Sequence, residues 1–460
     1  MDIEIKNICS IRDANIKFDG LTVIAGENDT GKSTVGKLIF AIVKAMNRYE
    51  EDFSENKEIT IKNLVDSIYF DLRKTSKANE LEVLKEEFFP NFFIRQLRSF
   101  IEPDTYTQLT FLDTNKEEEV NNIINKKIEF INKFNVSNKV KVIEILNKIK
   151  NELIQKKGQE ELITNALTKA FNSEFYFEIT PKNKPDAISS IKCKEGENKI
   201  LSLEIKKDSI FKFKLFDQIL FNDVTFIETP VVIQMYDLIS QARTLFDIDS
   251  NEESFSSFRQ SRAKIALHTK DLISKLENAQ YLSNGVKLSR FEKDNFFIKK
   301  LVDIENIMKG EFIFQKKDRE FIFQKKDAKE NIKIKSSNTA SGIKTFGLIQ
   351  LLIQAGIIKE RSLLVIDEPE NHLQPEWQVK YAQLLVELVK NNVYVVLSSH
   401  SPYMIQALKV FSERVGIKDK TNFYLAEKQS KGDFSKIQNV SDDLNRLFIK
   451  LSQPFQDLVW

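Results

Sequence analysis

The spacing of hydrophobic and polar residues changes along the chain, and each change predicts a different element. Near the N-terminus, residues alternate with period two and predict strands at 2–6, 15–18 and 21–25, with Asp19-Gly20 as a tight hairpin turn. Beyond the third strand, apolar residues recur every three or four positions, namely at Val35, Leu38, Ile39, Ile42, Val43 and Met46. This spacing predicts one buried face of a helix, which we expect to end near Asn47, where an acidic stretch begins.

A long helical pattern follows, and we expect residues 49–171 to form a helical insertion. An aromatic cluster at 88–93 surrounds Pro90, which interrupts the pattern. Its phenylalanines could stack on nucleic-acid bases, but core packing is favoured because few basic residues lie among them. The lysine-rich run at 125–157 could form a coiled-coil arm. Its heptad pattern does not persist, so a packed helical domain is favoured.

Period two returns between residues 172 and 228. It predicts five strands, at 175–179, 188–194, 200–205, 210–215 and 224–227. Helical spacing resumes from 232 to 308. We expect residues 235–308 to form a second helical insertion.

An internal repeat comes next. The sequence E-F-I-F-Q-K-K-D occurs at 311–318 and again at 320–327. Two strand-length copies predict adjacent antiparallel strands around Asp318-Arg319, because a solenoid needs three or more repeats. The lysine pairs could contact phosphates or form a solvated turn or edge.

Two apolar runs in the C-terminal third, at 363–366 and 393–397, are typical of central strands buried on both faces. Between them, Pro375 begins a helix with an apolar face, and Asn391-Asn392 ends it. A strand, a helix and a second strand predict a parallel sheet. In such sheets, ligands bind at the carboxyl ends of the strands.

Composition narrows the classes of protein that fit. The 460 residues, 42% of them hydrophobic and 30% charged, are typical of a soluble globular protein with two or three domains. The net charge of +2 gives no global field, so any nucleic-acid site would be a local patch. Cys9 and Cys193 are the only cysteines, which excludes a disulfide scaffold and leads us to expect a reducing cytoplasm. We expect no signal peptide and no membrane span.

The candidate chemistry begins in the loop after the third predicted strand. Residues 26–34 fit the pattern G-x-x-x-x-G-K-[ST] between a strand and a helix, the context of a phosphate-binding loop rather than a chance glycine turn. Backbone N–H groups of such a loop surround an anion, a lysine reaches the terminal phosphates, and a hydroxyl can ligate Mg²⁺. The predicted nucleotide-binding residues are Gly26, Asn28, Asp29, Thr30, Gly31, Lys32, Ser33 and Thr34.

Carboxylates follow the first of the two apolar C-terminal strands. Asp367 and Glu368 have the form of a Walker B motif, in which the first carboxylate lies beside Mg²⁺ and the second activates the attacking water. The second apolar strand ends in Ser-Ser-His-Ser-Pro, which places His400 where it could contact a γ-phosphate. The alternative for His400 is a capping histidine in a turn.

A run of small hydroxyl residues precedes another predicted helix. Ser341 and Gly342 stand at its start. They could form a simple N-cap or a second anion site that holds a γ-phosphate.

The order of these motifs resembles an ABC-type ATPase head, specifically its SMC/RecF-like and OLD-like soluble branch. The Gly-Glu-Asn opening of the phosphate loop, the Glu-Pro-Glu-Asn-His-Leu continuation and the Ser-His-Ser-Pro ending resemble standalone ATPases that accompany nucleases in prokaryotic anti-phage systems. The resemblance covers residues 1–48 and 330–460, and the strands of 172–228 fit loosely. It implies an α/β P-loop NTPase: an ABC-type head at 1–48, 172–234 and 309–460, with a mixed or parallel core sheet, an antiparallel β subdomain and a helical insertion.

The resemblance also implies roles for individual residues. Lys32, Glu368 and His400 correspond to catalytic positions, and Ser33 and Asp367 to the Mg²⁺ ligands of an ATP site. Ser341 and Gly342 correspond to the signature, which in ABC-type dimers completes the partner subunit's site, and Asn371 to Leu373 occupy the D-loop position. The signature lacks the second glycine of the transporter form. Gln234 is the first candidate for the Q-loop residue, and Gln96 is the second.

These features together predict an ATPase that forms a homodimer, or an oligomer of dimers, around ATP and Mg²⁺. OLD-type proteins carry a nuclease domain after the ATPase, whereas Asp442-Asp443 is better interpreted here as a helix cap. We therefore expect a separate effector, a nuclease or toxin, in anti-phage defence, with DNA or a phage protein as a further partner. The alternatives are a mainly non-hydrolysing ATP-bound scaffold and a DNA repair or chromosome-maintenance ATPase. A transporter subunit is disfavoured because Gly26 and Asp367 lie too far apart in sequence.

Overall fold

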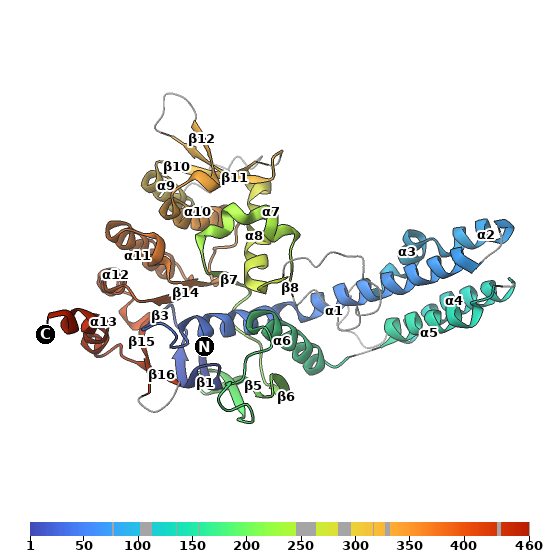
Figure 1. The fold of residues 1–460 in the computed structure, drawn as a ribbon, viewed down its shortest axis with the longest axis horizontal. Helices are drawn as coiled ribbons and strands as arrows, with labels where there is room; N and C mark the ends of the chain where they lie inside the picture. Colours follow the sequence, from blue (N-terminus) through green and yellow to red (C-terminus); the bar gives the residue numbers. More distant parts are fainter. Residues whose placement is uncertain are drawn as a thin grey trace. The chain divides into compact units, whose positions relative to one another are not determined.

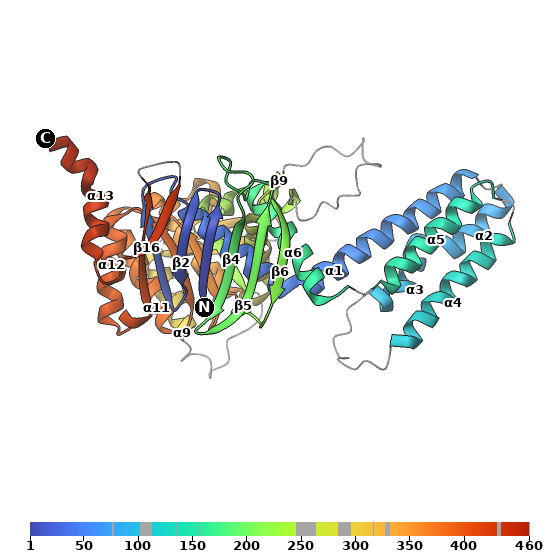
Figure 2. The same ribbon diagram turned by 90° about the horizontal axis from the view of Figure 1, so that it is seen from below.

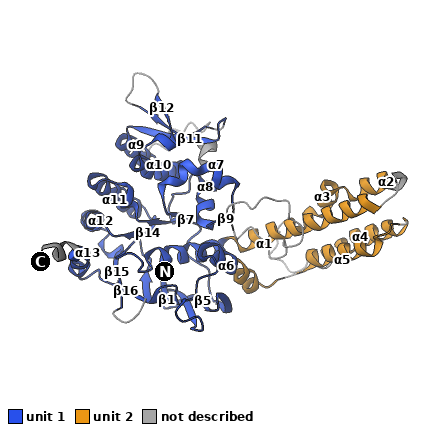
Figure 3. Ribbon diagram, viewed as in Figure 1, with its two compact units in different colours: residues 1–47, 167–460 blue, residues 48–166 orange. Residues whose placement is uncertain are grey.

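The computed structural model divides the chain into two compact units (Figure 3). Unit 1 comprises Met1–Asn47 and Leu167–Trp460, and unit 2 comprises Arg48–Ala166. The structure describes all residues except 76–77, 102–112, 135, 156, 245–263, 284–295, 316, 327–331, 430–433 and 460. Parts of the helical pattern expected between 232 and 308 therefore lie outside the described residues.

Unit 1 is built around an 11-stranded sheet with the order β6-β5-β4-β1-β2-β16-β15-β3-β14-β13-β7. Its strands are β1 (Asp2–Ile8), β2 (Ile11–Lys17), β3 (Leu21–Gly26), β4 (Ser189–Glu195), β5 (Asn198–Lys206), β6 (Ser209–Leu215), β7 (Val224–Ile227), β13 (Leu363–Asp367), β14 (Tyr394–Ser399), β15 (Thr421–Lys428) and β16 (Ser435–Asn439). From β15 to β7 the neighbours pair in parallel, whereas β2, β1, β4, β5 and β6 form an antiparallel meander. This is the predicted α/β fold with a mixed sheet.

Helices cover both faces of the parallel strands. On one face lies α1 (Lys32–Thr75), whose Gly36 packs so closely that a Cβ there would be 3.0 Å from Val365 Cγ1. On the other face, α10 (Ser341–Gln354), α11 (Pro375–Lys390) and α12 (Pro402–Arg414) share a core with alternate residues of β3, β13 and β14. Figure 1 shows the start of α1 between the parallel and the antiparallel strands. Burial on both faces explains the continuous apolar runs.

Unit 1 contains further helices. They are α6 (Gln159–Phe175), which begins in unit 2, η1 (Pro230–Met235), α7 (Tyr236–Gln241), α8 (Leu267–Ser283), α9 (Phe296–Met308), η5 (Ser336–Asn338), η6 (Pro369–His372), η7 (Lys418–Lys420) and α13 (Leu444–Val459). A pair of two-residue strands, β8 (Arg243–Thr244) and β9 (Lys264–Ile265), lies among them. Residues of η1, α7, α8 and α9 belong to the same core as β3 and β13.

The predicted hairpin at Asp19-Gly20 is wrong. The strands β2 and β3 do not pair, because β16 and β15 lie between them, as Figure 2 shows for β16 beside β2. The hairpin partner of β2 is β1, through Cys9 and Ser10. Gly20 is nonetheless required, since it adopts φ +97° and a Cβ there would lie 2.7 Å from the carbonyl oxygen of Lys420. Parallel pairing of the buried strands outweighs the local turn signal.

The predicted helix end at Asn47 is also wrong, because α1 continues without interruption to Thr75. The acidic stretch is helical, and Arg48 pairs across turns with Glu51, 3.0 Å away, and with Asp52, 3.7 Å away. Charged residues at such spacings stabilise an exposed helix. The change from apolar to polar composition therefore marks where α1 leaves one unit for the other, not where it ends.

The strand predicted at 175–179 is absent, since α6 runs through Phe175. Phe171 and Phe175 form an aromatic pair one helical turn apart, with ring centroids 6.3 Å from each other. Tyr176 and Phe177 follow with φ values of 51° and 64°, which end the helix in a turn. The alternation of aromatic residues here reflects a helix end rather than a strand. The other four strands predicted in this region are present.

Unit 2 is a packed helical bundle with its own core. Besides the second half of α1, it contains α2 (Ala78–Phe88), α3 (Pro90–Ile101), α4 (Asp113–Asn132) and α5 (Lys139–Ile154). Of the aromatic cluster, Phe88 and Phe93 are buried in that core, and Phe89 and Phe92 are half exposed. Core packing therefore explains Phe88 and Phe93, but not the half-exposed Phe89 and Phe92.

The internal repeat forms a hairpin of a separate three-stranded sheet, as predicted. The first copy is β10 (Gly310–Gln315), the second is β11 (Glu320–Lys325), and β12 (Ile332–Lys335) completes the sheet. Phe312 packs on α10 so closely that a Cβ on Gly347 would lie 2.2 Å from its ring. The buried side chain of Gln350 hydrogen-bonds both backbone polar groups of Phe312, at 2.9 and 3.3 Å.

Candidate nucleotide site

The loop between β3 and α1 has a backbone that only glycine fits at two positions. Gly26 adopts φ +152°, and a Cβ there would lie 2.3 Å from the carbonyl oxygen of Ala426. Gly31 adopts φ +86°, and its Cβ would lie 2.5 Å from Ile11. These two glycines let β15 and β2 approach the loop, which then turns sharply into α1. The three residues from Glu27 to Asp29 are exposed at its tip.

Lys32 is folded back over this loop from the first turn of α1. Its ammonium group donates to the carbonyl oxygens of Gly26 at 3.0 Å and Glu27 at 2.8 Å. The Thr30 hydroxyl donates to the same Glu27 carbonyl at 2.8 Å. The side chain of Lys32 is only 4% exposed, so its charge is held at one position near the helix N-terminus. A fixed cation beside the free N–H groups of a helix start favours an anion.

Asp367 ends β13 beside this loop and faces α1. It accepts a hydrogen bond from the Ser398 hydroxyl at the end of β14, and the Ser33 hydroxyl of α1 lies near enough to lower its pKa. Burial raises the pKa of the Asp367 carboxyl, although these two hydroxyls oppose the shift. A carboxylate and a hydroxyl near each other at the start of the helix are oxygen ligands of the kind that Mg²⁺ prefers.

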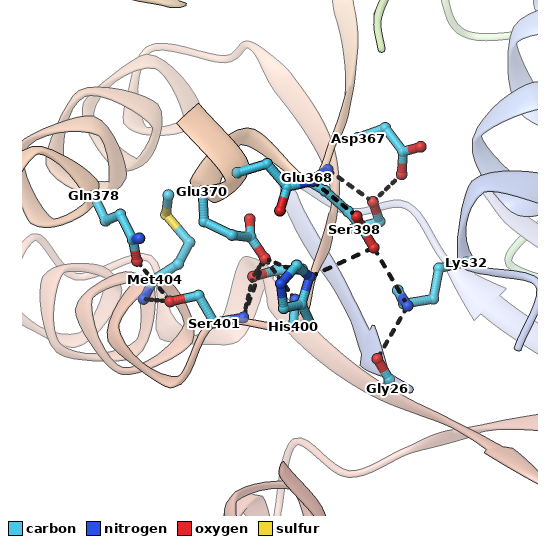
Figure 4. A network of polar contacts seen from close by, with 12 residues as sticks. Gly26, Lys32, Asp367, Glu368, Glu370, Gln378, Ser398, His400, Ser401 and Met404 are labelled. Atoms are coloured by element: carbon cyan, nitrogen blue, oxygen red, sulfur yellow. Dashed lines mark hydrogen bonds and ion pairs between the residues drawn. The ribbon is translucent and has the colours of Figure 1, made fainter. Parts of the chain in front are cut away.

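Glu368 has a left-handed backbone with φ 43°, and its N–H donates to the Ser398 carbonyl oxygen at 3.1 Å. This turn directs its side chain toward Lys32, with Oε1 3.5 Å from the ammonium nitrogen (Figure 4). Burial alone would raise the pKa of Glu368, but a hydrogen bond from Asn371 at 3.0 Å, together with Lys32 and His400, holds it below its usual value. The Glu368 carboxyl is therefore ionised at neutral pH.

His400 follows β14, and the Glu370 carboxylate fixes the backbone around it (Figure 4). The Glu370 Oε1 atom accepts from the Ser399 hydroxyl at 2.7 Å, from the His400 N–H at 2.6 Å and from the Ser401 N–H at 3.1 Å. The Ser401 hydroxyl also donates to Gln378 at 2.6 Å. His400 itself is 43% exposed, and its Nδ1 lies 3.5 Å from Glu368 Oε1. The imidazole thus lies at the surface beside the candidate base.

The structure brings Lys32, Ser33, Asp367, Glu368 and His400 together at the carboxyl ends of β3, β13 and β14, as their sequence context predicted. Asn28, Asp29, Thr30 and Thr34 belong to the same loop and helix start, and Asp29 forms an ion pair with Lys428 at 3.0 Å.

Ser341 and Gly342 lie at the start of α10, on a different part of unit 1. Ser341 is exposed, and a Cβ on Gly342 would lie 3.3 Å from the carbonyl oxygen of His372, in the predicted D-loop. Ala340 is the N-cap residue of α10 and provides no side-chain cap, so neither serine nor glycine serves as a simple N-cap.

The two glutamines considered for the Q-loop have different surroundings. Gln234 lies in η1, after β7, and accepts a hydrogen bond from the buried Lys344 of α10. Gln96 lies in α3 of unit 2.

The residues present fit ATP and Mg²⁺. The loop supplies a cation and helix N–H groups for phosphates, and Asp367 and Ser33 supply hard oxygen ligands for a metal. Within the described part of the chain, no group of three or more His, Cys, Asp or Glu side chains could hold a metal ion.

Three residues that the sequence did not single out as functional lie beside this site. Glu228 directly follows β7, and the buried His268 of α8 contacts it at 3.1 Å and Glu174 of α6 at 2.6 Å. Burial would lower the pKa of His268, but the hydrogen bonds to the two carboxylates outweigh it and raise the pKa to about 9. The sequence could have indicated Glu228, because it follows an apolar strand as Asp367 does. It could not have indicated the contacts of His268, because its partners lie in distant segments of the sequence.

The sequence matches the AAA ATPase domain family over residues 1–405, which is most of the chain. This chain belongs to that family. Its α/β fold with a P-loop agrees with the family, and the nucleotide site described above lies within the matched residues. No curated protein matches the sequence.

Solved structures similar to this chain include SMC head domains. One is an SMC head bound to the C-terminal winged-helix domain of ScpA, with 12% identity, a TM-score of 0.41 and coverage of 97% of this chain and 98% of that one. Another is the SMC head from Thermotoga maritima, with 11% identity, a TM-score of 0.36 and coverage of 95% and 98%. A third, from Pyrococcus furiosus with an extended coiled coil, has 10% identity, a TM-score of 0.31 and coverage of 98% of both chains.

None of the described helices is both long enough and apolar enough to cross a membrane.

Proposed function

We propose that this protein binds and hydrolyses ATP with Mg²⁺ and dimerises around the bound nucleotide. The observation that carries the proposal is the convergence of a buried lysine, a partly buried aspartate and an ionised glutamate at the carboxyl ends of the parallel strands. A lone phosphate loop would support binding only. Glu368, held ionised beside Lys32, adds a base that can act on a water molecule.

Each residue then has a defined task. Lys32 and the loop N–H groups hold the terminal phosphates, and Ser33 and Asp367 hold Mg²⁺, which supplies neutralisation of phosphate charge. Glu368 orients or deprotonates the attacking water. His400, exposed beside Glu368, contacts the γ-phosphate.

We propose that Ser341 and Gly342 complete the site of a second copy of the chain. The exposure of Ser341 at the start of a helix supports this role, because the N–H groups there can bind the γ-phosphate presented by another molecule. Nucleotide state would therefore control whether two copies associate. The homodimer is the smallest assembly with complete sites.

We further propose that this cycle controls a separate effector, a nuclease or toxin, in anti-phage defence. Support comes from the Glu-Pro-Glu-Asn-His-Leu and Ser-His-Ser-Pro segments, which resemble defence ATPases and here form the network of Glu370 and His400. DNA or a phage protein would be the trigger. Pull-down of the native protein with and without ATP would test for an effector.

The deciding experiment compares the wild type with Glu368→Gln, which keeps the shape and removes the base. We expect turnover to fall on the order of 100-fold or more, while ATP binding persists and sedimentation shows an ATP-bound dimer. Glu376→Gln, an exposed carboxylate on α11, is the matched control and should hydrolyse ATP normally. Wild-type turnover in Glu368→Gln would refute the role of Glu368.

A second candidate, a DNA repair or chromosome-maintenance ATPase, has one observation in its favour. A basic hollow in unit 1 is lined by the cations Lys6, Arg12, Lys184 and Lys436, with Asp13 as the single carboxylate among its lining residues. Such a cluster suits nucleic-acid phosphates. This candidate predicts ATPase activity that DNA stimulates and DNA binding that falls steeply with salt. Absence of both would exclude it.

A further inference from the structure

The tip of the phosphate loop carries two exposed carboxylates, Glu27 and Asp29, on either side of Asn28. The carbonyl oxygen of Glu27 accepts hydrogen bonds from the Lys32 ammonium group and from the Thr30 hydroxyl, both at 2.8 Å. The tip is therefore attached to the cation that reaches the phosphates. Two negative charges at this position oppose the approach of a polyphosphate. The loop needs compensating positive charge if it is to bind ATP.

Two lysines from the C-terminal part of the chain supply that charge. Lys450 of α13 has its Nζ 3.0 Å from Glu27 Oε1. Lys428, the last residue of β15, has its Nζ 3.0 Å from Asp29 Oδ2. One ammonium group thus lies beside each carboxylate, so the charges at the loop tip cancel.

The C-terminal helix holds Lys450 at a defined position. Arg446, one turn earlier on α13, donates to Glu427 of β15 and, at 2.9 Å, to Gln438 of β16. Leu447 is completely buried in the core of unit 1, and the side chain of Lys450 is only 30% exposed. A pair anchored in this way loses less side-chain entropy on forming than a pair between two free surface chains. The fold therefore places the Lys450 charge beside the loop.

The second pair lies further out in the solvent. The side chains of Lys428 and Asp29 are 46% and 82% exposed. Water and salt screen charges at such positions more strongly than partly buried ones. We therefore expect Lys428 to contribute less than Lys450.

We propose that Lys450 and Lys428 are positioning residues of the nucleotide site, which act through Glu27 and Asp29. By pairing with these carboxylates they let the loop accept the polyphosphate of ATP. The inference rests on the proposed function, since it requires a nucleotide at the loop. It makes the C-terminal helix a functional part of the site, although the motifs include no residue of α13. Because the effect is electrostatic, it grows with the number of phosphate charges and is screened by salt.

A double-mutant cycle tests this role. A fluorescent ATP analogue is titrated at low ionic strength with the wild type, Lys450→Ala, Glu27→Gln and the variant that carries both changes. We expect Lys450→Ala to bind about fivefold more weakly, because Glu27 is left uncompensated. The double variant should bind like the wild type, because the opposing charge is gone as well. The loss should be smaller for an ADP analogue and fall below about twofold at about 0.5 M salt.

Lys380→Ala is the matched control. Lys380 forms an exposed ion pair of 2.7 Å with Glu376 on α11, so this change also removes one positive charge from unit 1 and breaks one ion pair. It should bind the analogue like the wild type. An equal loss in Lys380→Ala and Lys450→Ala would overturn the proposal, because net charge alone would then account for the effect.

Two further results would overturn the role of Lys450. One is unchanged binding by a Lys450→Ala protein whose folding is checked by thermal unfolding. The other is an equal loss from Lys450→Ala with and without Glu27→Gln, since the lysine would then act independently of that carboxylate. Should Lys450→Ala not fold, Lys428→Ala with Asp29→Asn provides the same cycle at an exposed pair. If the wild type binds no nucleotide, the proposed function itself fails, so the two failures are distinguishable.

Discussion

Two parts of unit 1 that the sequence assigns to one chemical task differ in how they are built. At the ends of β3, β13 and β14, the polar groups contact one another: Lys32 reaches Glu368, and Ser398 bridges to Asp367. At the start of α10, Ser341 is exposed to solvent. The first part is an assembled site with fixed charges. The second is an exposed helix start without a side-chain cap.

The proposed dimer accounts for this difference: the first part supplies its own chemistry, and the second acts on the nucleotide of a partner. Fixed, buried charges cost free energy to assemble, and a protein retains them where their positions matter. An exposed helix start costs little and serves a ligand that arrives from outside. The contrast can be tested by changing each part separately and measuring nucleotide binding, stability and association.

The largest effect is expected at the assembled site, for Lys32→Ala. Removing the buried ammonium deprives the phosphates of a charge-assisted hydrogen bond, so nucleotide affinity should fall by about 3 kcal/mol, a factor on the order of 100. Equilibrium binding of a fluorescent ATP analogue measures it. Lys418→Ala, exposed in η7, should bind like the wild type. Equal affinities in the two variants would contradict the assignment of Lys32.

Gly26→Ala should have the next largest effect. The added Cβ meets the Ala426 carbonyl oxygen and forces a side chain into φ +152°, which costs about 1–3 kcal/mol and distorts the loop. We expect a lower free energy of unfolding, measured by denaturant titration, together with weaker nucleotide binding. Gly158→Ala has open space around its Cβ and is the control. A stable, fully binding Gly26→Ala would show that the loop does not need this geometry.

Ser341→Arg should leave nucleotide binding intact and block association. The long cationic side chain would occupy the exposed start of α10 without touching the assembled site. Sedimentation with ATP and Mg²⁺ should show monomers, and turnover should fall with the loss of dimers. Ser337 is also exposed and lies three residues before Ala340, so Ser337→Arg tests whether any added arginine blocks association. A dimeric, active Ser341→Arg would end the proposal of a composite site.

The smallest effect concerns pH. Burial raises the pKa of Glu368 while Asn371, Lys32 and His400 lower it, with a net shift below the usual value. Asn371→Ala removes one of the lowering contacts, so the pKa of Glu368 should rise and the base should become protonated at a higher pH. The acid limb of the turnover profile should therefore move to higher pH by less than about one unit. Gln374→Ala, exposed nearby, should leave the profile unchanged.

Much of the fold and of the assembled site could be predicted because the relevant signals are local. A continuous apolar run before Asp367 identifies a central strand, and the loop pattern before Lys32 identifies the start of a helix. Parallel strands align their carboxyl ends, so separate motifs had to converge. A local signal also predicted the hairpin of the repeat. The roles of these residues in turnover and association stay predictions.

The errors came from signals that are not local. Asp19-Gly20 is a good turn sequence, but the hydrogen-bond partners of β3 are β14 and β15, from the far end of the chain. The polar stretch after Asn47 changed composition without changing helical geometry. His268 meets Glu174 and Glu228, which are 94 and 40 residues away in sequence. The periodicity of a single sequence does not predict such long-range contacts.

The repeated hairpin of β10 and β11 carries a risk of self-association that the fold addresses. Its core triplet Phe-Ile-Phe reads the same in both directions and pairs with itself in the antiparallel register, so strands from different molecules would match equally well. On the β10 edge, the amide of Gln350 occupies the backbone groups of Phe312 that an added strand would use. On the β12 edge, Lys333 and Lys335 are exposed charges that oppose stacking of further strands. A buried glutamine and two lysines thereby keep a self-complementary sequence from continuing its sheet into neighbouring molecules.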